Sequence, residues 1–362
     1  MLNPVSKKIC IVVKSLGGGG AERSAGLLSI MLSDLGHEVH VVTVLNDIKY
    51  PYAGTLLNLG TIKDQNSKLS AGLKRFRTLF KYIRSNDFDY LIDNRTRVNR
   101  MKEFLVSKIL YKPNKTIYCM RSFNLYNYMP TNAFMARMWY GNANKVVGVS
   151  EAISEKLQNK YHFNNVITIQ NPIDISFEKS LSDTIIEGDY ILFFGRLIDA
   201  VKNVSLLIEA YEKSNLHQEN VKLVIMGDGK DKVDFEKKVA MKSCADSIQF
   251  LDFNPNPSNL ITNAKYTVLT SHYEGFPRMI LESLSLGTPI ISVNCMSGPS
   301  EIIQNGKNGL LVDNYNVVAL TEAMNTLYFD EELYQRCKEN SKSSVVKFSQ
   351  NNIAKQWQNI LN

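Results

Sequence analysis

The sequence of 362 residues is poor in cysteine and histidine. Its five cysteines lie far apart along the chain and form no CxxC pair, which argues against a disulfide framework and favours a reducing compartment. The five histidines form no HExxH motif and no cluster with the spacing of metal ligands. We therefore expect a protein that needs no bound metal.

The sequence also lacks a long apolar run. A membrane-spanning helix needs about 18 consecutive apolar residues, and no such stretch occurs. The apolar residues after Lys7 and Lys8 are too few for the core of a signal peptide. These absences predict a cytoplasmic protein. Its apolar content of 44% is typical of globular chains, and its length predicts two domains.

Positive charge is concentrated in the first half of the chain. Residues 1–170 carry 24 Lys and Arg against 11 Asp and Glu, whereas residues 171–362 carry 18 against 24. The first half should therefore face an anionic partner, which could be a membrane surface, a phosphorylated acceptor or a nucleic acid. A solvated basic surface without a partner is the alternative.

Short apolar strands alternate with amphipathic helices in both halves, which is typical of parallel α/β sheets. In the first half we predict a helix over 21–35, ended by Gly36, and strands over 8–14, 38–45, 89–92, 116–120 and 145–149. The pattern restarts after Pro172, with a helix over 204–214 and strands over 190–194, 222–226, 249–251, 266–270 and 289–293.

The predicted fold is therefore α/β, with two Rossmann-like, doubly wound domains over residues 1–170 and 171–345. Residues 346–362 should form a closing helix that packs back toward the N-terminal domain, because Ile353, Trp357 and Ile360 recur at helical spacing. Ligands bind at the carboxyl ends of the strands in such sheets, so we expect the site between two facing domains.

A run of four glycines, Gly17 to Gly20, follows the first predicted strand and opens a helix. It does not match the GxGxxG fingerprint, because Arg23 stands where the third glycine should be, and no Gly-Lys-Ser/Thr follows. Glycines let a ligand approach the backbone closely, and the amides of the helix favour an anion. We predict a ligand-binding loop; a plain tight turn is the alternative.

Charged residues follow two strands of the second half. Arg196 comes directly after strand 190–194, and Lys202 follows six residues later. Two cations at a strand's carboxyl end can neutralise the phosphates of a leaving nucleotide. Glu274 and Glu282 lie after strand 266–270, where carboxylates can accept hydrogen bonds from sugar hydroxyls. Surface charges without function are the alternative for each residue taken alone.

Seven segments, taken in order, resemble glycosyltransferase family 4, whose fold is GT-B. They are Gly17 to Arg23 (GGGGAER), Val147 to Ser150 (VGVS), Asn171 to Asp174 (NPID), Gly195 to Asn203 (GRL…KN), Gly227 to Gly229 (GDG, whose glycines favour a turn), Glu274 to Glu282 (EGFP…E) and Ser297 to Val312 (SGPSEII…NGLLV).

The resemblance implies a two-domain glycosyltransferase that retains the anomeric configuration and needs no metal. It implies that Arg196 and Lys202 hold the donor diphosphate, that Glu274 lies beside the donor sugar and that Glu282 binds the ribose. The remaining donor-binding positions that we predict are Gly18, Gly19, Gly20, Gly195, Phe276, Pro277, Arg278 and Met279. Members with Gly-Gly-Ala-Glu-Arg often build surface polysaccharides or lipid-linked oligosaccharides.

The predicted acceptor-binding residues are Arg77, Arg95 and Arg121. Many family members carry a histidine in the first domain, but residues 117–124 contain none, and Arg121 is the nearest candidate. Arg95 belongs to an arginine-rich stretch, residues 94–100, that follows a predicted strand. A structural cation is the alternative for Arg121.

Residues 68–84 predict a basic amphipathic helix. An apolar stripe, Leu69, Leu73, Phe76, Phe80 and Ile83, is flanked by Lys74, Arg77, Lys81 and Arg84. Such a helix can lie on an anionic membrane or grip a lipid-linked pyrophosphate. Packing of the stripe on the sheet is the alternative. Asp87-Phe88-Asp89 resembles a DxD metal motif, but we interpret it as a helix-to-strand turn.

The sequence thus predicts a retaining transferase that moves a hexose or N-acetylhexosamine from a nucleotide sugar, UDP-linked rather than GDP-linked, to a glycan or polyprenyl-linked acceptor. It should act as a peripheral protein at the inner face of the membrane. One alternative is a nucleotide-sugar epimerase with the same fold. The other is a basic nucleic-acid-binding protein, although no known nucleic-acid-binding module is present.

Overall fold

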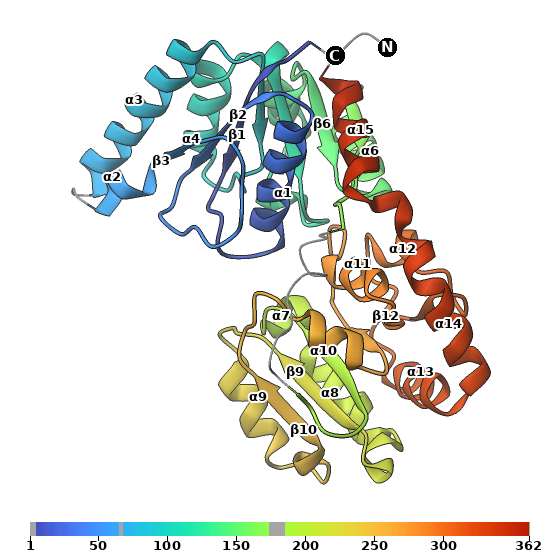
Figure 1. The fold of residues 1–362 in the computed structure, drawn as a ribbon. Helices are drawn as coiled ribbons and strands as arrows, with labels where there is room; N and C mark the ends of the chain where they lie inside the picture. The colour runs from blue at the N-terminus through green and yellow to red at the C-terminus, as the bar shows by residue number, and fades with distance from the viewer. Residues whose placement is uncertain (1–4, 65–67, 174–184, 362) are drawn as a thin grey trace. The chain divides into compact units, whose positions relative to one another are not determined.

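The computed structural model describes residues 5–64, 68–173 and 185–361. The chain forms two compact units (Figure 1). The first unit comprises Met1–Pro172 together with Gln350–Asn362, and the second comprises Ile173–Ser349. The boundaries predicted from the sequence, after residues 170 and 345, lie within a few residues of these. Asp174, part of one family-like segment, lies outside the described residues.

The first unit contains a seven-stranded sheet in which neighbouring strands are parallel. The strand order is β3-β2-β1-β4-β5-β6-β7. The strands are β1 (Lys8–Val13), β2 (Glu38–Thr43), β3 (Thr55–Asn58), β4 (Tyr90–Asp93), β5 (Thr116–Met120), β6 (Lys145–Gly148) and β7 (Val166–Thr168). Five of them were predicted; β3 and β7 were not.

The helices of this unit alternate with its strands. They are α1 (Gly20–Asp34), α2 (Gly60–Asp64), α3 (Lys68–Asn86), α4 (Arg100–Leu105), the π-helix η1 (Val106–Leu110), α5 (Ala133–Tyr140) and α6 (Glu151–Tyr161). Gly36 has a φ of +86°, a left-handed conformation that glycine adopts without strain, and it follows the end of α1 as predicted.

The second unit contains a six-stranded parallel sheet in the order β10-β9-β8-β11-β12-β13. Its strands are β8 (Tyr190–Phe194), β9 (Lys222–Met226), β10 (Ile248–Leu251), β11 (Thr267–Leu269), β12 (Ile290–Val293) and β13 (Gly309–Val312). The helices are α7 (Asp199–Lys202), α8 (Val204–Lys213), α9 (Lys232–Val239), α10 (Ser258–Asn263), α11 (Arg278–Ser285), α12 (Pro299–Ile302), α13 (Val317–Phe329) and α14 (Glu331–Ser344).

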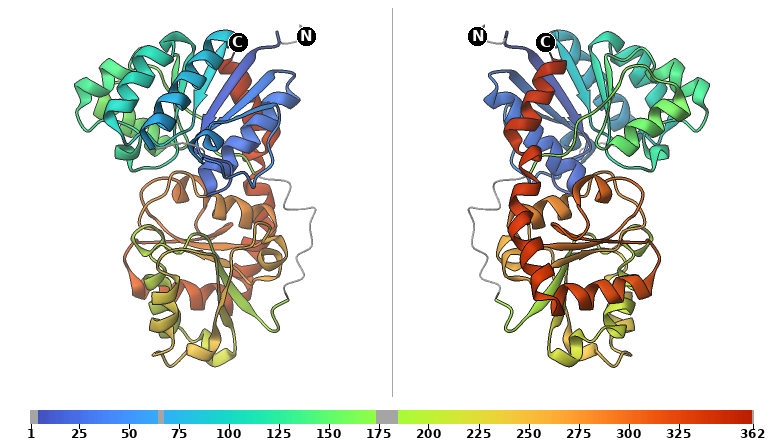
Figure 2. Two further views of the ribbon diagram at one scale, coloured as in Figure 1. Left: turned by 90° about the vertical axis from the view of Figure 1, so that its left-hand side faces the viewer. Right: turned by 90° about the vertical axis from the view of Figure 1, so that its right-hand side faces the viewer.

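The C-terminal helix α15 (Gln350–Ile360) is part of the core of the first unit. Ile353, Ala354 and Trp357 are buried in one apolar cluster with Ile9 and Ile11 of β1. Figures 1 and 2 show this helix in red beside the blue segments of the first unit, where it contacts α1. The apolar face read from the sequence is the face that packs, with Ile360 partly buried at its end.

Two loops at the carboxyl edge of the second sheet touch backbone to backbone. The Leu197 amide donates a hydrogen bond to the Asp228 carbonyl over 2.8 Å. A Cβ atom built on Gly227 would lie 1.8 Å from the Gly195 carbonyl oxygen, and one on Gly229 would lie 2.0 Å from that of Leu197. These glycines therefore form a turn, as predicted, and also allow the loop after β9 to support the loop after β8.

We expect Gly227→Ala to lower the free energy of unfolding of the second unit by about 1 to 3 kcal/mol, because the two loops must part to admit the methyl group. Urea denaturation would measure this change. The matched control is Gly72→Ala in α3, where nothing lies within 4 Å of the added carbon. That change should be neutral or stabilising, since alanine favours helix. Equal stability of Gly227→Ala and the unmodified protein would contradict the packing requirement.

Candidate functional site

In each sheet, the chain adds successive strands on one side of the first strand and then crosses to its other side. In the first unit the chain builds outward from β1 to β3 and then returns to place β4 on the other side of β1. In the second unit β11 is placed on the free side of β8 in the same way. Loops after the two strands at such a crossing, the reversal point of the sheet, diverge, and this is where open α/β sheets bind ligands. The predicted site residues are therefore considered at these two places.

Lys202 and Glu274 meet at the reversal point of the second sheet. The Lys202 Nζ lies 2.6 Å from the Glu274 Oε1, and the two side chains are 20% and 14% exposed. Both residues were predicted, but their pairing was not. Lys202 ends the short helix α7, and Asn203, with a φ of +48°, separates it from α8. The lysine is therefore at the end of one helix and not at the start of the next.

The loop that carries Glu274 is tied to the segment that carries Lys202. The Thr270 hydroxyl donates to the Lys202 carbonyl over 3.0 Å, and the His272 amide donates to the Val201 carbonyl over 2.9 Å. The Ser271 hydroxyl also donates to the Glu274 Oε1 over 2.6 Å. Held from both sides, the carboxylate has a fixed position, which a catalytic site requires. Sequence reasoning missed Thr270 and Ser271.

Arg196 is exposed at the same edge, directly after β8. The amide of the preceding Gly195 donates to the Met226 carbonyl over 3.0 Å, which fixes the base of the loop. The structure thus brings Arg196, Lys202 and Glu274 to one edge of one sheet. Two cations and a carboxylate at this edge can bind an anion and a hydroxylated ligand together.

The predicted donor-binding residues Phe276 to Met279 and Glu282 lie on or before helix α11. Arg278 and Glu282 form an ion pair in which the Arg278 Nη2 lies 3.1 Å from the Glu282 Oε1, and both are nearly buried. Phe276 and Met279 are buried, and Phe276 packs against Phe348 with ring centroids 5.1 Å apart. These two side chains support the loop, so a ligand would meet their backbone.

A thiol lies close to this site but is not poised to react. Cys295 is buried after β12, and burial, aided by the charge of Glu274, raises the pKa of its thiol to about 12. A protonated thiol is a poor nucleophile. Cys295 therefore belongs to the packing of the site.

The glycine loop lies at the reversal point of the first sheet. A Cβ atom on Gly17 would lie 2.3 Å from the Asp47 Oδ1, so a larger residue at this position would clash with the Asp47 side chain. Gly18 is exposed, and an added carbon would meet only the Ser15 hydroxyl, at 3.9 Å. Helix α1 begins at Gly20, so its first amides face the same edge. The loop is therefore open to a ligand at Gly18 to Gly20.

Arg121 lies at the carboxyl end of β5 and is held by two asparagines. Its Nε and Nη2 donate to the Asn94 Oδ1 over 2.9 and 2.7 Å, and its Nη1 donates to the Asn171 Oδ1 over 2.7 Å. Asn94, which follows β4, was not predicted. Amide partners leave the positive charge of Arg121 without a neutralising carboxylate in these hydrogen bonds, so it can still attract an anion.

Arg95 is placed differently from the prediction. Its guanidinium lies 2.8 Å from the Asp93 carboxylate and 3.0 Å from that of Glu103. Burial alone would raise the pKa of Asp93, but the charges of Arg95 and Arg97 hold it below its ordinary value. Arg97 is fully buried, donates to four backbone carbonyls and lies over the ring of Tyr118. This cluster stabilises the first unit, and we assign Arg95 to it instead of to the acceptor.

Helix α3 packs on the first unit through residues outside the predicted apolar stripe. Ala71 and Leu79 are buried, whereas Leu73 of the predicted apolar stripe is 53% exposed. The side chain of Leu69 lies outside the described part of the chain. The cations Lys74, Arg77, Lys81 and Arg84 are all exposed and follow one another at intervals of three or four residues. They therefore form one row along the helix, which we call the cation row.

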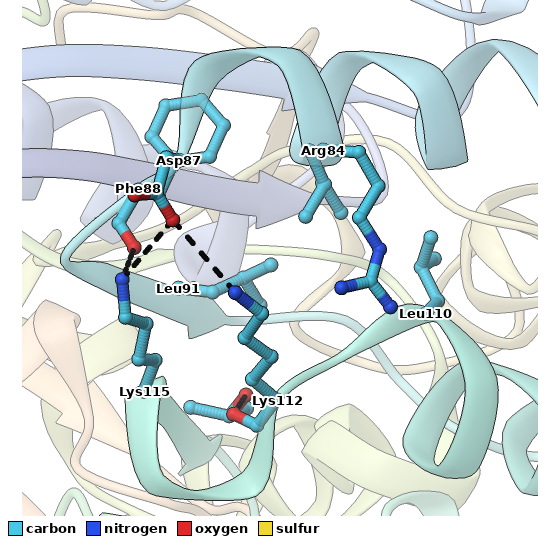
Figure 3. Close-up of a pocket in the computed structure, with 9 residues that line it drawn as sticks. Arg84, Asp87, Phe88, Leu91, Leu110, Lys112 and Lys115 are labelled. Carbon is cyan, nitrogen blue, oxygen red and sulfur yellow. Dashed lines mark hydrogen bonds and ion pairs between the residues drawn. The ribbon is translucent and has the colours of Figure 1, made fainter.

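A small basic pocket of about 40 Å³ lies at the amino ends of β4 and β5 (Figure 3). Lys112 and Lys115 contact Asp87 there, at 3.8 and 3.3 Å. Asp87 follows α3 with a φ of +39°, and Asp89 accepts a hydrogen bond from the Lys8 amide before β4 begins. The segment Asp87 to Asp89 is thus the predicted helix-to-strand turn, at the edge opposite to the glycine loop.

The described residues contain neither a metal-binding cluster nor a membrane-spanning helix. In that part of the chain, no group of three or more His, Cys, Asp or Glu side chains could hold a metal ion. Within the same residues, no helix is both long enough and apolar enough to cross a membrane.

Two family models match consecutive parts of the chain. The model "Glycosyltransferase Family 4" matches residues 18–177, and the model "Glycosyl transferases group 1" matches residues 177–344. The first includes the open part of the glycine loop, and the second includes Arg196, Lys202, Glu274 and Glu282.

Relatives match the chain over almost its whole length. The amylovoran biosynthesis glycosyltransferase AmsD of Erwinia amylovora is 23% identical, over 98% of this chain and 99% of its own. The GalNAc-alpha-(1->4)-GalNAc-alpha-(1->3)-diNAcBac-PP-undecaprenol alpha-1,4-N-acetyl-D-galactosaminyltransferase of Campylobacter jejuni is 28% identical, over 97% of both chains.

Solved structures share the fold. Alr3699/HepE of Anabaena in complex with UDP-glucose has a TM-score of 0.78 at 18% identity, over 98% of this chain and 99% of that one. WaaG, a glycosyltransferase involved in lipopolysaccharide biosynthesis, has a TM-score of 0.74 at 13% identity, over 98% and 99%. With two Rossmann-like units and both family models matched in order, this chain is a GT-B glycosyltransferase that belongs to glycosyltransferase family 4.

Proposed function

We propose that the protein transfers a hexose or N-acetylhexosamine from a nucleoside diphosphate sugar to a glycan or polyprenyl-linked oligosaccharide, with retention of configuration. The Lys202–Glu274 ion pair carries this proposal. It places a cation and a carboxylate 2.6 Å apart at the reversal point of the second sheet, next to the exposed Arg196. A departing diphosphate needs the cations, and a sugar needs the hydrogen-bond acceptor.

In the proposed reaction, the bond between the anomeric carbon and the diphosphate oxygen breaks, and its electron pair leaves with the nucleoside diphosphate. The acceptor hydroxyl oxygen forms the new bond on the same face of the sugar. Its proton passes to the departing phosphate. Arg196 and Lys202 stabilise the negative charge that develops on that phosphate, and Glu274 holds the sugar hydroxyls.

A UDP-sugar is the proposed donor. The structurally similar HepE has been solved with UDP and with UDP-glucose. Glu282 is proposed to accept hydrogen bonds from the ribose, for which it would exchange or share its contact with Arg278. Since Arg196 and Lys202 supply two positive charges to the diphosphate, the transfer is proposed to need no metal.

A polyprenyl-diphosphate-linked glycan is the proposed acceptor. The relative from Campylobacter jejuni is named for such a substrate, and AmsD is named for amylovoran biosynthesis. The cation row runs from Lys74 to Arg84, roughly 15 Å at the rise of an α-helix, and no Asp or Glu occurs between residues 68 and 86. A row of unopposed cations attracts a diphosphate. Arg121 is proposed to bind the acceptor glycan, and the reaction to occur at the inner face of the membrane.

A donor panel would test the reaction class. We expect release of nucleoside diphosphate from one UDP-sugar, in the presence of EDTA, when a polyprenyl-diphosphate glycan is added. The new glycosidic bond should have the anomeric configuration of the donor, as read by NMR. Isomerisation of the donor without transfer would indicate an epimerase. Salt-sensitive binding of nucleic acid without donor turnover would indicate the nucleic-acid-binding alternative.

The ion pair can be tested with a matched surface pair. We expect Lys202→Ala and Glu274→Ala each to lower kcat by about 100-fold or more, because each removes a group that contacts the reacting substrate. Urea denaturation should show that both variants fold. The control is Glu209→Ala with Lys213→Ala, an exposed ion pair of 2.7 Å on α8. Its loss should leave kcat unchanged. Near-normal turnover in either site variant would refute the assigned roles.

The cation row predicts a defect limited to the acceptor. We expect Arg77→Glu with Lys81→Glu to raise the acceptor KM about tenfold, since reversing two charges replaces attraction of the diphosphate with repulsion. The donor KM should not change. Lys237→Glu with Lys338→Glu makes the same change of charge on exposed positions of α9 and α14 and serves as the control. An equal effect of both pairs would show a non-specific influence of net charge.

A further inference from the structure

Helix α4 and the π-helix η1 that continues it expose most of their large apolar side chains. Four large apolar side chains, Met101, Phe104, Leu105 and Ile109, point to solvent and are between 41% and 80% exposed. The buried positions are Val106 and Leu110 together with two polar residues, Glu103, which is ion-paired to Arg95, and Ser107, which donates to a backbone carbonyl. A surface helix ordinarily buries its apolar residues and exposes its charged ones. The outer face of this segment is therefore suited to contact an apolar partner.

Helix α5 extends the same surface. Phe134 and Met138 are 67% and 45% exposed. The helix is joined to α4 and η1, because the ring centroids of Phe104 and Trp139 are 5.8 Å apart and the Lys108 Nζ donates to the Met138 carbonyl over 2.5 Å. In Figure 2 the teal and green helices of residues 100–140 lie together on one side of the first unit. The apolar patch consists of Met101, Phe104, Leu105, Ile109, Phe134 and Met138.

The exposed charges that α4, η1 and α5 themselves carry have one sign. Lys102, Lys108 and Arg137 are exposed among the residues of the apolar patch. Over residues 100–110 and 133–140, all of which the structure describes, the one carboxylate is Glu103, and it is buried. The Arg84 Nη2 donates to the Ile109 carbonyl over 3.4 Å, and Figure 3 shows Arg84 beside Leu110. The apolar patch therefore adjoins the end of the cation row.

This combination of side chains selects the partner. A second copy of the chain, joined through the same surface, would bring the lysines and arginines of both copies together, which is unfavourable. An anionic bilayer offers an apolar interior to the six apolar side chains and phosphates to the cations around them. Attraction between opposite charges and burial of apolar side chains then both favour binding at one surface.

We propose that the apolar patch docks the protein on an anionic phospholipid bilayer, with its apolar side chains below the headgroups and Lys102, Lys108 and Arg137 at the level of the phosphates. The proposal deepens the proposed function, on which its purpose rests, because docking would bring the cation row to the headgroup layer. A polyprenyl-linked diphosphate lies in that layer. The docking surface differs from the one predicted from the sequence, which was the apolar stripe of α3.

Vesicle flotation would test the docking surface. We expect the protein to float with vesicles of phosphatidylcholine and phosphatidylglycerol, and far less with phosphatidylcholine alone. Phe104→Ser with Ile109→Ser and Phe134→Ser should lower this binding about tenfold or more, because all three apolar side chains are removed from water when the protein binds the bilayer. The control is Val233→Ser with Met241→Ser and Val318→Ser, three exposed apolar residues of the second unit, which should bind as the unmodified protein does.

A second variant separates charge from apolar contact. Lys102→Glu with Arg137→Glu keeps the apolar patch and should remove the preference for the anionic vesicles. Flotation of both patch variants at the level of the unmodified protein would overturn the proposal, as would a lack of binding by the unmodified protein. A dimer in solution that the serine variant dissociates would assign the surface to a second copy.

The activity readout keeps the two proposals apart. With a water-soluble acceptor that carries a short lipid, the serine variant should release nucleoside diphosphate as fast as the unmodified protein. Vesicle binding without transfer from any donor would leave the docking surface in place and refute the proposed function. Transfer without vesicle binding would support the proposed function and refute the docking surface.

Discussion

Parallel pairing of the strands is the constraint on which the site depends. Because neighbouring strands run in the same direction, the residues that follow the strands of a sheet all lie at the same edge, at the carboxyl ends of the strands. Lys202 follows β8 and Glu274 follows β11, and the two residues are 72 positions apart in the sequence. The two strands are neighbours only because the sheet reverses its growth at β8. The same reversal brings the glycine loop and Asn94 together in the first sheet.

Much of this arrangement could be predicted from the sequence. Buried parallel strands are nearly continuous apolar runs, and such runs predicted most of the strands and the two-unit fold. The strands that were missed, β3, β7 and β13, lie at the edges of their sheets and are only partly buried, so their sequences are not continuous apolar runs. The roles of Arg196, Lys202 and Glu274 came from motifs. The contact between Lys202 and Glu274 could not be predicted, because it depends on the order of the strands in the sheet, and no local sequence pattern gives that order.

A pattern in the sequence does not show which face of an element is buried. Arg95 was predicted to bind the acceptor, but it lies in the interior, where it pairs with the carboxylates of Asp93 and Glu103. The periodicity of α3 gave an apolar stripe, yet the helix packs through Ala71 and Leu79. Periodicity shows that a helix has two faces. It does not show which neighbour each face meets when, as in α4, the buried face carries a glutamate.

The return of α15 to the first unit makes that unit discontinuous in sequence. The chain leaves the first unit after Pro172 and re-enters it at Gln350, whereas the two family models meet at residue 177 and end at residue 344. A recombinant made by joining the halves of two relatives at that junction would combine one parent's β1 and α1 with the other parent's Trp357. A recombinant that keeps the core of the first unit from one parent therefore requires the last thirteen residues, Gln350–Asn362, to move with the first half of the gene.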